Sequence, residues 1–575
     1  MSRRLTGRAA APGVAVAPAF VIQGRPKEAA PEPTQGAADP QQEKERLHHA
    51  LDTAARELRD IAKSVVEAAG EEEGEIFEAH ADFAADPELA RRAEEAIDGG
   101  ATAEDAVTEA FGWFRELLAA AQSEYLAARA ADLDDVRGRV VAILRGESTA
   151  VEAPRERSVI VAAELTPSET ATLPRALIAA ILTGAGSPTS HAAILARALG
   201  IPAVVGVAGL LDAVELGTEL AVDGGSGEIV VGPEDDERKD FEERARAGEV
   251  RRKRLTALRE EPGRTADGAP VGLAANLAGP DDIELARAAG AEGSGLVRTE
   301  FLYLGRRTPP GVEEQAAFYR QLFEAFSGHR VVIRTLDVGA DKPLPFVEQA
   351  PEPNPALGLR GIRIGLAQPD LLRLQLRAIL LAHEATRGQG THAAVNFPMV
   401  SRAEELSGAR SILDEAARQE GVDTEGLEVG VMVEVPSAAL AARRLAAACD
   451  FLSLGTNDLL QYLFAADRLV PEVSGLPDVL EPEVLRLIGA VANDAHAEGV
   501  WMGVCGEAAA DPVSALALVG AGADRLSMTP AAIPEVKDVL RRVTRDKLRE
   551  AAAEAMEAAD AAEARRRIEA ILPTR

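Results

Sequence analysis

The second half of the chain alternates short apolar runs with longer segments of helical periodicity. The runs are rich in Val, Leu and Ile, which suit buried strands. Eight such runs in roughly 300 residues are typical of a (β/α)8 TIM-type barrel. An open doubly wound sheet is the alternative, but no Gly-x-Gly-x-x-Gly turn follows the first run. The runs are residues 270–276, 293–297, 331–335, 394–399, 429–434, 451–454, 501–505 and 525–528.

The first half changes pattern twice. A short β segment at 1–23 precedes helix formers with apolar residues at helical spacing, such as Leu47, Leu51 and Leu58. Residues 150–232 return to β-like runs at 159–162, 178–182 and 202–205, with a helix at 191–199 between the last two. If residues 1–23 pair with these runs, the helical block is an insertion into one α/β domain.

These patterns together predict a multidomain α/β chain. A highly charged segment follows the α/β runs and has the composition of a linker helix. Residues 541–572, at the end of the barrel domain, are predicted to be an Ala/Glu/Arg-rich helix. The predicted domains are an α/β domain of residues 1–23 and 147–232, a helical insertion at 24–146, a linker helix at 233–262 and the barrel domain at 263–575.

Composition limits which partners, substrates and cellular settings suit the chain. The 62 Lys and Arg residues against 93 Asp and Glu residues give a net charge of −31, which disfavours nucleic acid and anionic membranes as partners. A small anionic substrate needs only a local basic pocket. The two cysteines, Cys449 and Cys505, cannot build a disulfide framework or a four-cysteine zinc site, so we expect a reducing, cytoplasmic setting.

The chain contains no apolar stretch long enough to predict a transmembrane helix. Arg3, Arg4 and Arg8 before an apolar stretch superficially resemble an export signal. However, Pro12 and Pro18 interrupt the stretch, and its β-branched residues favour a strand.

Charged and polar residues cluster just past the ends of the predicted barrel strands, where barrel enzymes carry their active sites. For each residue alone, a surface ion pair or a solvated side chain is the more common explanation, but the set occupies five strand ends. The set is Arg298, Arg334, Glu434, Asn457 with Asp458, and Cys505, with Asp337, Lys342 and Arg468 in the loops beyond.

The residue types of this set indicate a ligand with phosphate and carboxylate groups. Arginine forks bind both groups in a bidentate manner. Glu434 and Asp458 could chelate Mg2+ through oxygen and leave positions for substrate oxygens. We therefore predict a site for a small phosphorylated carboxylic acid and a divalent cation.

A second constellation lies in the α/β domain. The Gly-rich stretch 184–186 leads through Ser190 to His191 at the start of a predicted helix. A helix N-terminus stabilises a phosphate group, and it favours the neutral, nucleophilic form of a histidine over the protonated one. His191 could accept a phosphoryl group there. A histidine that only caps or packs is an equally good interpretation of this segment taken alone.

Motifs from both constellations recur with others along nearly the whole chain. They closely resemble enzyme I of the bacterial sugar phosphotransferase system, the phosphoenolpyruvate–protein phosphotransferases. Besides the His191 segment, the motifs are APGVA (11–15), IFEAH (76–80), DPEL (86–89), AAD (130–132), LTPSET (165–170), GLVRTEFL (295–302), GVMVEVP (430–436), GTNDL (455–459) and CGE (505–507).

The resemblance implies a function and a role for each site residue. Phosphoenolpyruvate would phosphorylate a histidine, releasing pyruvate, and the phosphoryl group would pass to a small histidine-containing phosphocarrier docked on the helical insertion. The resemblance also implies a homodimer through the barrel. The implied roles are His191 as nucleophile, Cys505 as proton donor, Glu434 and Asp458 as Mg2+ ligands, and Arg298, Arg334, Asn457, Asp458 and Arg468 as substrate contacts, with Lys342, Arg360 and Thr170 as further candidates.

The sequence departs from the family pattern without losing a charged catalytic group. Ser187-Pro188 stands where the family usually shows glycine and a basic residue, and Ala340 stands where glycine is usual. A dikinase or phosphoenolpyruvate synthase is the first alternative, but the first 150 residues show no Gly-rich nucleotide-binding loop. A non-enzymatic scaffold would leave the strand-end residues without a purpose, and the nitrogen-linked paralogue usually carries an extra sensory domain.

Overall fold

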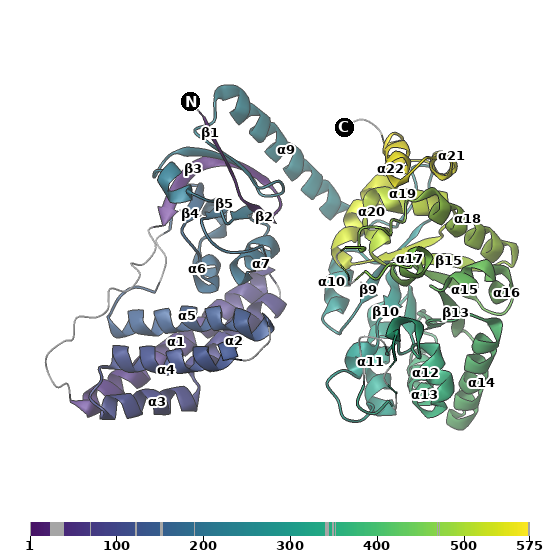
Figure 1. Ribbon diagram of the computed structural model, residues 1–575, viewed down its shortest axis with the longest axis horizontal. Coiled ribbons are helices and arrows are strands. Elements are labelled where there is room, and N and C mark those ends of the chain that lie inside the picture. The colour runs from purple at the N-terminus through teal and green to yellow at the C-terminus, as the bar shows by residue number, and fades with distance from the viewer. Residues whose placement is uncertain are drawn as a thin grey trace. The chain divides into compact units, whose positions relative to one another are not determined.

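The computed structural model divides into two compact units, residues 1–252 and 253–575, each of which has its own cores. Figure 1 traces both along the chain. The residues that the structure describes are 2–22, 39–69, 71–120, 124–149, 153–188, 190–339, 344–347, 350, 352–468, 470 and 472–572.

The first unit is built on an eight-stranded mixed sheet with the order β1-β8-β7-β3-β4-β5-β6-β2. β3, β4, β5 and β6 run parallel, while β1, β8, β7 and β2 pair antiparallel with their neighbours. The N-terminal segment, predicted as one β segment, forms three strands, and β7 and β8 were not predicted. The strands are β1 (Arg3–Thr6), β2 (Arg8–Ala11), β3 (Val14–Ile22), β4 (Ser158–Ala162), β5 (Ile178–Thr183), β6 (Ala203–Val205), β7 (Glu219–Asp223) and β8 (Glu228–Val231).

A helical bundle interrupts the sheet between β3 and β4. Its apolar residues at helical spacing, such as Leu47, Leu51 and Leu58, form a core that also contains residues of the sheet. Pro87 begins α3 behind the Asp86 cap, whereas Gly74 lies inside α2. The helices are α1 (Pro40–Ala69), α2 (Glu71–Ala84), α3 (Pro87–Asp98), α4 (Ala103–Ala120) and α5 (Glu124–Leu144).

Short helices follow the central strands of the sheet, and a long one ends the unit. α7 begins at His191, as predicted, after the Ser190 cap. The long helix α9 (Asp235–Ala257) lies within the predicted linker range, and Phe241 packs it against Ala221 and Val230 of the sheet. The other helices are α6 (Pro167–Thr172), α7 (His191–Ala198), α8 (Leu210–Ala213) and a 3-10 turn at Arg175–Leu177.

The second unit is a closed barrel of eight parallel strands, which confirms the predicted fold class. All eight predicted strands are present, with ends displaced by at most two residues. They are β9 (Gly272–Leu277), β10 (Gly293–Val297), β11 (Arg330–Arg334), β12 (His392–Phe397), β13 (Glu428–Val433), β14 (Phe451–Gly455), β15 (Trp501–Cys505) and β16 (Arg525–Met528).

Helices surround this barrel (Figure 1). The longest connections carry α11, α13, α14 and α18, which pack with the outward face of the strands in one core. The helices are α10 (Asp282–Ala288), α11 (Val312–Ala325), α12 (Ile362–Ala367), α13 (Pro369–Thr386), α14 (Ala403–Glu420), α15 (Pro436–Leu440), α16 (Ala442–Ala446), α17 (Thr456–Phe464), α18 (Pro482–Ala497), α19 (Pro512–Gly520) and α20 (Ile533–Leu540), with 3-10 turns at Glu300–Leu302, Pro355–Leu357, Glu507–Ala510 and Pro530–Ala532.

The C-terminal segment forms separate helices where the sequence predicted continuous helix. α21 (Arg545–Met556) and α22 (Ala561–Glu569) follow α20. Thr544 and Asp560 cap the two new starts, because their side-chain oxygens accept backbone N–H groups of the first turn. Among the described residues, no helix is both long and apolar enough to cross a membrane.

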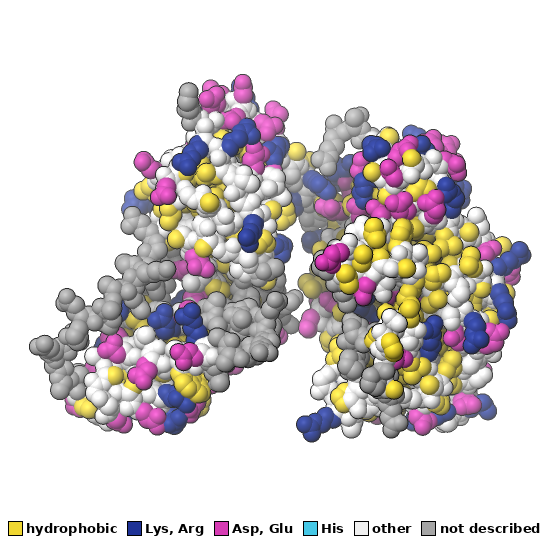
Figure 2. All heavy atoms as spheres, in the orientation of Figure 1, with side chains coloured by type: hydrophobic (Ala, Val, Ile, Leu, Met, Phe, Trp, Pro, Cys, Tyr) yellow, Lys and Arg dark blue, Asp and Glu magenta, His cyan; other side chains and the backbone are white. Residues whose placement is uncertain are grey.

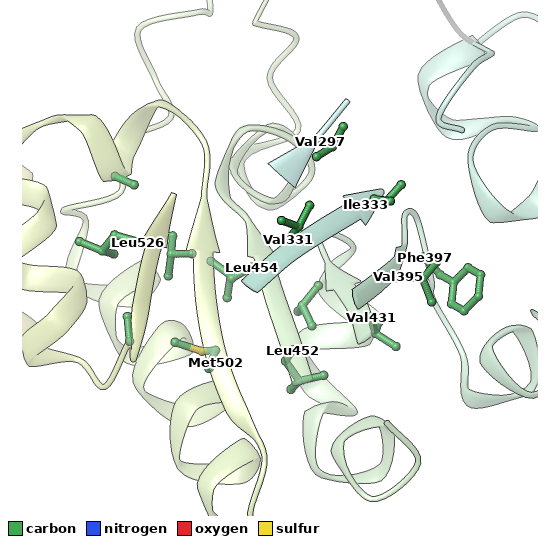
Figure 3. Packing of buried hydrophobic residues seen from close by; sticks show 14 of the residues in the cluster. Val297, Val331, Ile333, Val395, Phe397, Val431, Leu452, Leu454, Met502 and Leu526 are labelled. Carbon is green, nitrogen blue, oxygen red and sulfur yellow. The ribbon is translucent and has the colours of Figure 1, made fainter. Parts of the chain in front are cut away.

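Alternation along the barrel strands separates two apolar layers. Figure 3 shows residues of the layer that packs against the helices, among them Val331, Ile333, Leu452 and Leu454. Residues one position away face the barrel interior, as Val332 does. Arg334 and Cys505 belong to the inward-facing set of residues. They lie at the carboxyl ends of their strands, where the candidate site lies.

Candidate functional site

A cavity of about 610 Å³ opens at the carboxyl end of the barrel strands. This is the end at which barrel enzymes hold their active sites. Most of the site residues predicted from the sequence line it, and they come from five strands and the loops that follow those strands. They are Arg298, Arg334, Arg360, Glu434, Asn457, Asp458, Arg468 and Cys505.

Arg334 is held by two buried carboxylates. Its Nη2 donates to Glu300 Oε1 at 2.6 Å, and its Nη1 lies 3.2 Å from Asp337 Oδ2. The backbone N–H of Asp337 also donates to Glu300 Oε1, at 3.1 Å. Burial lowers the pKa of Arg334, but the charges of Glu300 and Asp337 outweigh it, so the pKa rises and the guanidinium stays charged.

Arg360 extends this network toward the opposite wall. Its Nη2 lies 3.0 Å from Asp337 Oδ2, and its Nη1 lies 3.4 Å from Asp458 Oδ1. Asp458 is in the first turn of α17 and is largely buried. The chain of alternating charges therefore runs from Glu300 through Arg334, Asp337 and Arg360 to Asp458.

Glu434 is the most crowded carboxylate of the site. It follows β13 directly, is 1% exposed, and accepts the backbone N–H of Met399 at 2.7 Å. Burial, followed by the charges of Asp458 and Asp337, raises its pKa to about 8. The charges of Asp458 and Asp337 both oppose ionisation of Glu434, so a bound cation would stabilise its carboxylate.

Arg298 and Arg468 are the exposed cations of the cavity. Arg298 follows β10, and among the described residues its side chain makes no ion pair or hydrogen bond that would occupy it. Arg468 lies in the loop after α17, where its backbone N–H donates to Gln461 Oε1 at 3.5 Å. The site therefore combines two paired arginines, Arg334 and Arg360, with two exposed ones.

Cys505 ends β15 at the floor of the cavity and is 3% exposed. Burial raises the pKa of its thiol to about 11, so the group is protonated at neutral pH. The neighbouring Asn457 accepts the backbone N–H of Glu507 at 3.3 Å, which ties the loop after β14 to the loop after β15. A protonated thiol facing an anion-binding cavity can act as an acid.

The second constellation lies in the first unit, beside a cavity of about 490 Å³. Thr170, Thr183, Ser187 and Ser190 line this cavity. The Thr170 hydroxyl donates to Thr166 O at 2.9 Å, and Ser190 caps α7 by accepting the N–H of Ala193 at 3.4 Å. The backbone of His191 begins α7, while its side chain lies outside the described atoms, as does the whole of Lys342.

Sequence reasoning gave no role to Glu300, which lies two residues after Arg298. The sequence did show Glu300 as an acidic residue two positions after a strand-end arginine. Tyr462, whose hydroxyl accepts Arg360 Nη1 at 3.2 Å, was also missed, because nothing in a helical sequence shows which loop its side chain will contact.

Three family models match the chain, and each describes a part of a PEP-utilising enzyme. The model of the N-terminal domain matches residues 6–129, that of the mobile domain residues 154–227, and that of the PEP-binding domain residues 252–545. The class of protein that the fold and the site define is therefore that of enzymes which use phosphoenolpyruvate.

Curated relatives narrow this class. Relatives named phosphoenolpyruvate-protein phosphotransferase are 46% identical in Streptomyces coelicolor, over 93% of this chain and 93% of the relative, and 44% identical in Haloferax volcanii, over 86% of both. A relative of the same name in Staphylococcus carnosus is 37% identical over 98% of both chains. The chain belongs to the family of phosphoenolpyruvate–protein phosphotransferases. The predicted family and enzymatic activity are thus confirmed.

Proposed function

We propose that phosphoenolpyruvate phosphorylates His191 and that the phosphoryl group then passes to a small histidine-containing phosphocarrier protein, as the first step of sugar phosphotransfer. The observation that carries this proposal is the barrel cavity. Five strand ends place arginine, carboxylate, amide and thiol groups around one space of about 610 Å³. This set matches a substrate that has a phosphate, a carboxylate and a carbon to be protonated.

Substrate binding in this proposal uses the cations and the amide of the cavity. The forks of Arg298 and Arg468 are exposed and suit the phosphate and carboxylate oxygens. Arg334 and Arg360 present charge from fixed positions, because Asp337 and the adjacent carboxylates hold them. Fixed donors stabilise developing charge without a reorganisation cost during the reaction. Asn457 is also assigned to the substrate, and Lys342 stays a candidate contact.

Glu434 and Asp458 are the proposed Mg2+ ligands. Hard oxygen ligands are those that Mg2+ prefers, and the crowding of carboxylates at Glu434 is the observation that fits a cation there. Among the described residues, no group of three or more histidine, cysteine or acidic side chains is arranged to hold a metal. Substrate oxygens and water would therefore complete the coordination. Bound Mg2+ supplies charge neutralisation at the phosphoryl and enolate oxygens.

The proposed reaction begins when a nitrogen of His191 attacks phosphorus. The bond between phosphorus and the enol oxygen breaks, and its electron pair leaves with the enolate of pyruvate. Cys505 then gives its proton to C3 of the enolate, which produces pyruvate and leaves a thiolate. In the second half-reaction, the bond from phosphorus to His191 breaks as a bond to the histidine of the carrier forms. Thr170 is proposed to contact the phosphohistidine.

The predicted domains receive roles in this proposal. Residues 1–23 and 147–232 carry His191, residues 24–146 dock the carrier, 233–262 link the units and 263–575 bind phosphoenolpyruvate. Trp113 on α4 supports docking on the bundle: its ring is 38% exposed, and the Arg92 guanidinium lies 3.5 Å from its centroid. Exposed aromatic and arginine side chains are enriched at protein interfaces.

A homodimer through the barrel unit completes the proposed assembly. Figure 2 shows hydrophobic side chains gathered on one face of the barrel unit. Large exposed apolar side chains occur on the barrel unit, among them Leu357, Leu440 and Leu476, which are 65%, 82% and 57% exposed. Apolar patches of this kind mark association surfaces. We also propose a cytoplasmic location, since both cysteines are free thiols and the proposed chemistry needs Cys505 reduced.

The test of the proposed function is transfer of label from phosphoenolpyruvate. The full chain is incubated with Mg2+ and phosphoenolpyruvate labelled at phosphorus, with and without a purified histidine-containing phosphocarrier. We expect acid-labile label on the chain, its passage to the carrier, and the loss of both in His191→Ala. The matched control is His329→Ala, which changes an exposed histidine just before β11, outside the proposed docking region and the cavity. Undiminished label on His191→Ala would overturn the assignment of the nucleophile.

A further inference from the structure

A small cavity lies inside the barrel, on the side of Cys505 away from the substrate cavity. Its volume is about 10 Å³, and its polar lining includes the hydroxyls of Ser453 on β14 and Ser527 on β16 and the side chain of Arg525. Both serines are 4% exposed. The rest of the lining includes the small residues Gly295 and Gly503 and the ring of Trp501.

Of these two serines, Ser453 is the one that contacts the thiol. Its Oγ donates to Cys505 Sγ at 3.7 Å, and Cys505 Sγ in turn donates to Leu454 O at 3.6 Å. The Ser527 hydroxyl donates instead to Asn276 Oδ1 at 2.6 Å. In the strand register, Ser527 on β16 lies directly across from Cys505, while Ser453 on β14 pairs with Gly503. The two serines therefore differ in the partner of the hydroxyl and not in their distance along the strands.

Loss of the proton would leave a thiolate in a poor environment for an anion. Cys505 packs in the barrel with Leu296 and Met432. Glu434 at the end of β13 opposes a negative charge on the sulfur, while Arg334 of β11 and Arg298 after β10 favour it from their sides of the cavity. A hydrogen-bond donor in contact with sulfur stabilises the charged form most directly, because the bond strengthens as charge develops.

We propose that Ser453 is a positioning residue for proton transfer: its hydroxyl fixes the direction of the Cys505 thiol and stabilises the thiolate that remains after the enolate is protonated. This inference rests on the proposed function of Cys505. The proton moves from sulfur to C3 of the enolate, and the S–H electron pair stays on sulfur. Ser453 keeps its own proton throughout and only shares it in the hydrogen bond.

The first test measures the reverse of this proton transfer. Full-length enzyme with Mg2+ and pyruvate in D2O exchanges deuterium into the pyruvate methyl group, which is followed by proton NMR. For Ser453→Ala, we expect the kcat of exchange to fall by about threefold or more with the KM for pyruvate unchanged, since one hydrogen bond to the reacting group is lost. Ser453→Thr keeps the hydroxyl and should restore most of the rate.

Ser527→Ala is the matched control, because it removes an equally buried hydroxyl from the same small cavity. We expect it to exchange deuterium within about twofold of the parent, as is typical of a residue whose side chain does not touch the reacting group. Equal losses in Ser453→Ala and Ser527→Ala, or no loss in Ser453→Ala, would overturn the proposal.

The second test needs no turnover. The rate of alkylation of Cys505 by iodoacetamide is measured by peptide mass spectrometry at pH values from 8.5 to about 10.5. Below a raised thiol pKa, the reactive thiolate fraction, and with it the rate, grows steeply with pH. For Ser453→Ala, we expect the rate profile to move to higher pH by about half a unit to one unit, the range that one lost hydrogen bond supports. The Ser527→Ala profile should stay with the parent, and an unmoved profile in Ser453→Ala would contradict the proposed hydrogen bond.

The two tests separate this inference from the proposed function. If Cys505→Ala exchanged deuterium as fast as the parent, the proton-donor role of Cys505 would be wrong whatever the serine variants did. The alkylation profiles would still report whether Ser453 stabilises the thiolate. If Cys505→Ala is inactive and the Ser453→Ala profile is unmoved, the function stands and the inference about Ser453 is wrong.

Discussion

The two ends of the barrel carry similar residue types but use them differently. At the end where the strands begin, Arg330 donates to Glu428 through two nitrogens, both at 2.7 Å. Trp501 stacks on Phe451 with ring centroids 4.5 Å apart, and the Arg330 guanidinium lies 4.6 Å from the Trp501 centroid. Arg525, at the start of β16, donates to Glu292 O at 3.0 Å, and its guanidinium lies 5.9 Å from the Trp501 centroid. This end therefore holds an arginine–glutamate pair and a second arginine packed around aromatic rings.

At the end where the strands finish, carboxylates outnumber their paired arginines. Arg334 and Arg360 contact Glu300, Asp337 and Asp458, and Glu434 lies against the same group. A cavity of about 610 Å³ remains open there. One end is closed by the Arg330–Glu428 pair and aromatic packing, whereas the other keeps an open cavity whose carboxylates and two exposed arginines suit a cation and an anionic substrate.

Neutralising one carboxylate at each end of the barrel is the most direct test of this difference between the two ends. Glu434→Gln should lower the rate of pyruvate release from phosphoenolpyruvate by about 100-fold or more, because the proposed Mg2+ site loses a charged ligand. Glu428→Gln should leave that rate within about twofold, since its partner Arg330 has no part in the reaction. A steady-state assay of pyruvate checks both, and equal losses at the two ends would contradict the comparison.

Replacing one arginine by lysine at each end of the barrel tests the same difference between the two ends. Arg334→Lys loses the fork that spans Glu300 and Asp337, so we expect activity to fall by roughly 10- to 100-fold. Arg330→Lys loses a bidentate contact and a ring contact, and we expect a cost of about 1–2 kcal/mol in unfolding free energy with activity retained. Urea denaturation and the pyruvate assay, run on both variants, separate the two outcomes.

The raised pKa of Glu434 should also make stability depend on pH. Its pKa is raised from 4.5 to about 8 in the fold, so between these values the folded chain holds a proton that the unfolded chain has released. Rising pH therefore favours unfolding across this window. In EDTA, the parent should lose more than about 1 kcal/mol of stability relative to Glu434→Gln from pH 5 to pH 8. Parallel pH profiles for the two proteins would contradict this expectation.

The smallest effect should come from the closed end. Trp501→Phe keeps a ring against Phe451 but removes the indole N–H that donates to Glu428 Oε2 at 3.4 Å. We expect a loss of about 0.5–1 kcal/mol in unfolding free energy, because one long hydrogen bond disappears. Phosphotransfer should stay within about twofold of the parent, and a larger loss of activity would show that this end does contribute to the site.

Most of the barrel could be predicted from the sequence. The eight apolar runs gave all eight strands within two residues of their ends, since short buried parallel strands separated by helices leave a strong periodic signal. The strand-end residues were found for the same reason: once a strand is placed, the residue after it is known to lie at the active-site end. Arg298, Glu434 and Cys505 are examples.

What the sequence could not show depends on contacts between distant segments. The bond from Arg360 to Asp458 joins residues 98 positions apart, and no periodicity encodes it. Strands β7 and β8 were missed in an α/β domain whose other strands all lie in segments that were predicted to be β. The C-terminal helices were merged, because the caps Thr544 and Asp560 sit in an Ala/Glu/Arg-rich stretch whose composition alone favours continuous helix.

Binding of phosphoenolpyruvate measured by calorimetry tests the central claim, that the open end of the barrel is the substrate site. His191→Ala serves as the background, because it removes the proposed phosphoryl acceptor and leaves the barrel unchanged. We predict Mg2+-dependent binding in His191→Ala, none detectable after Glu434→Gln is added, and undiminished binding after Glu428→Gln is added instead. Binding of equal strength in the two double variants would contradict the account.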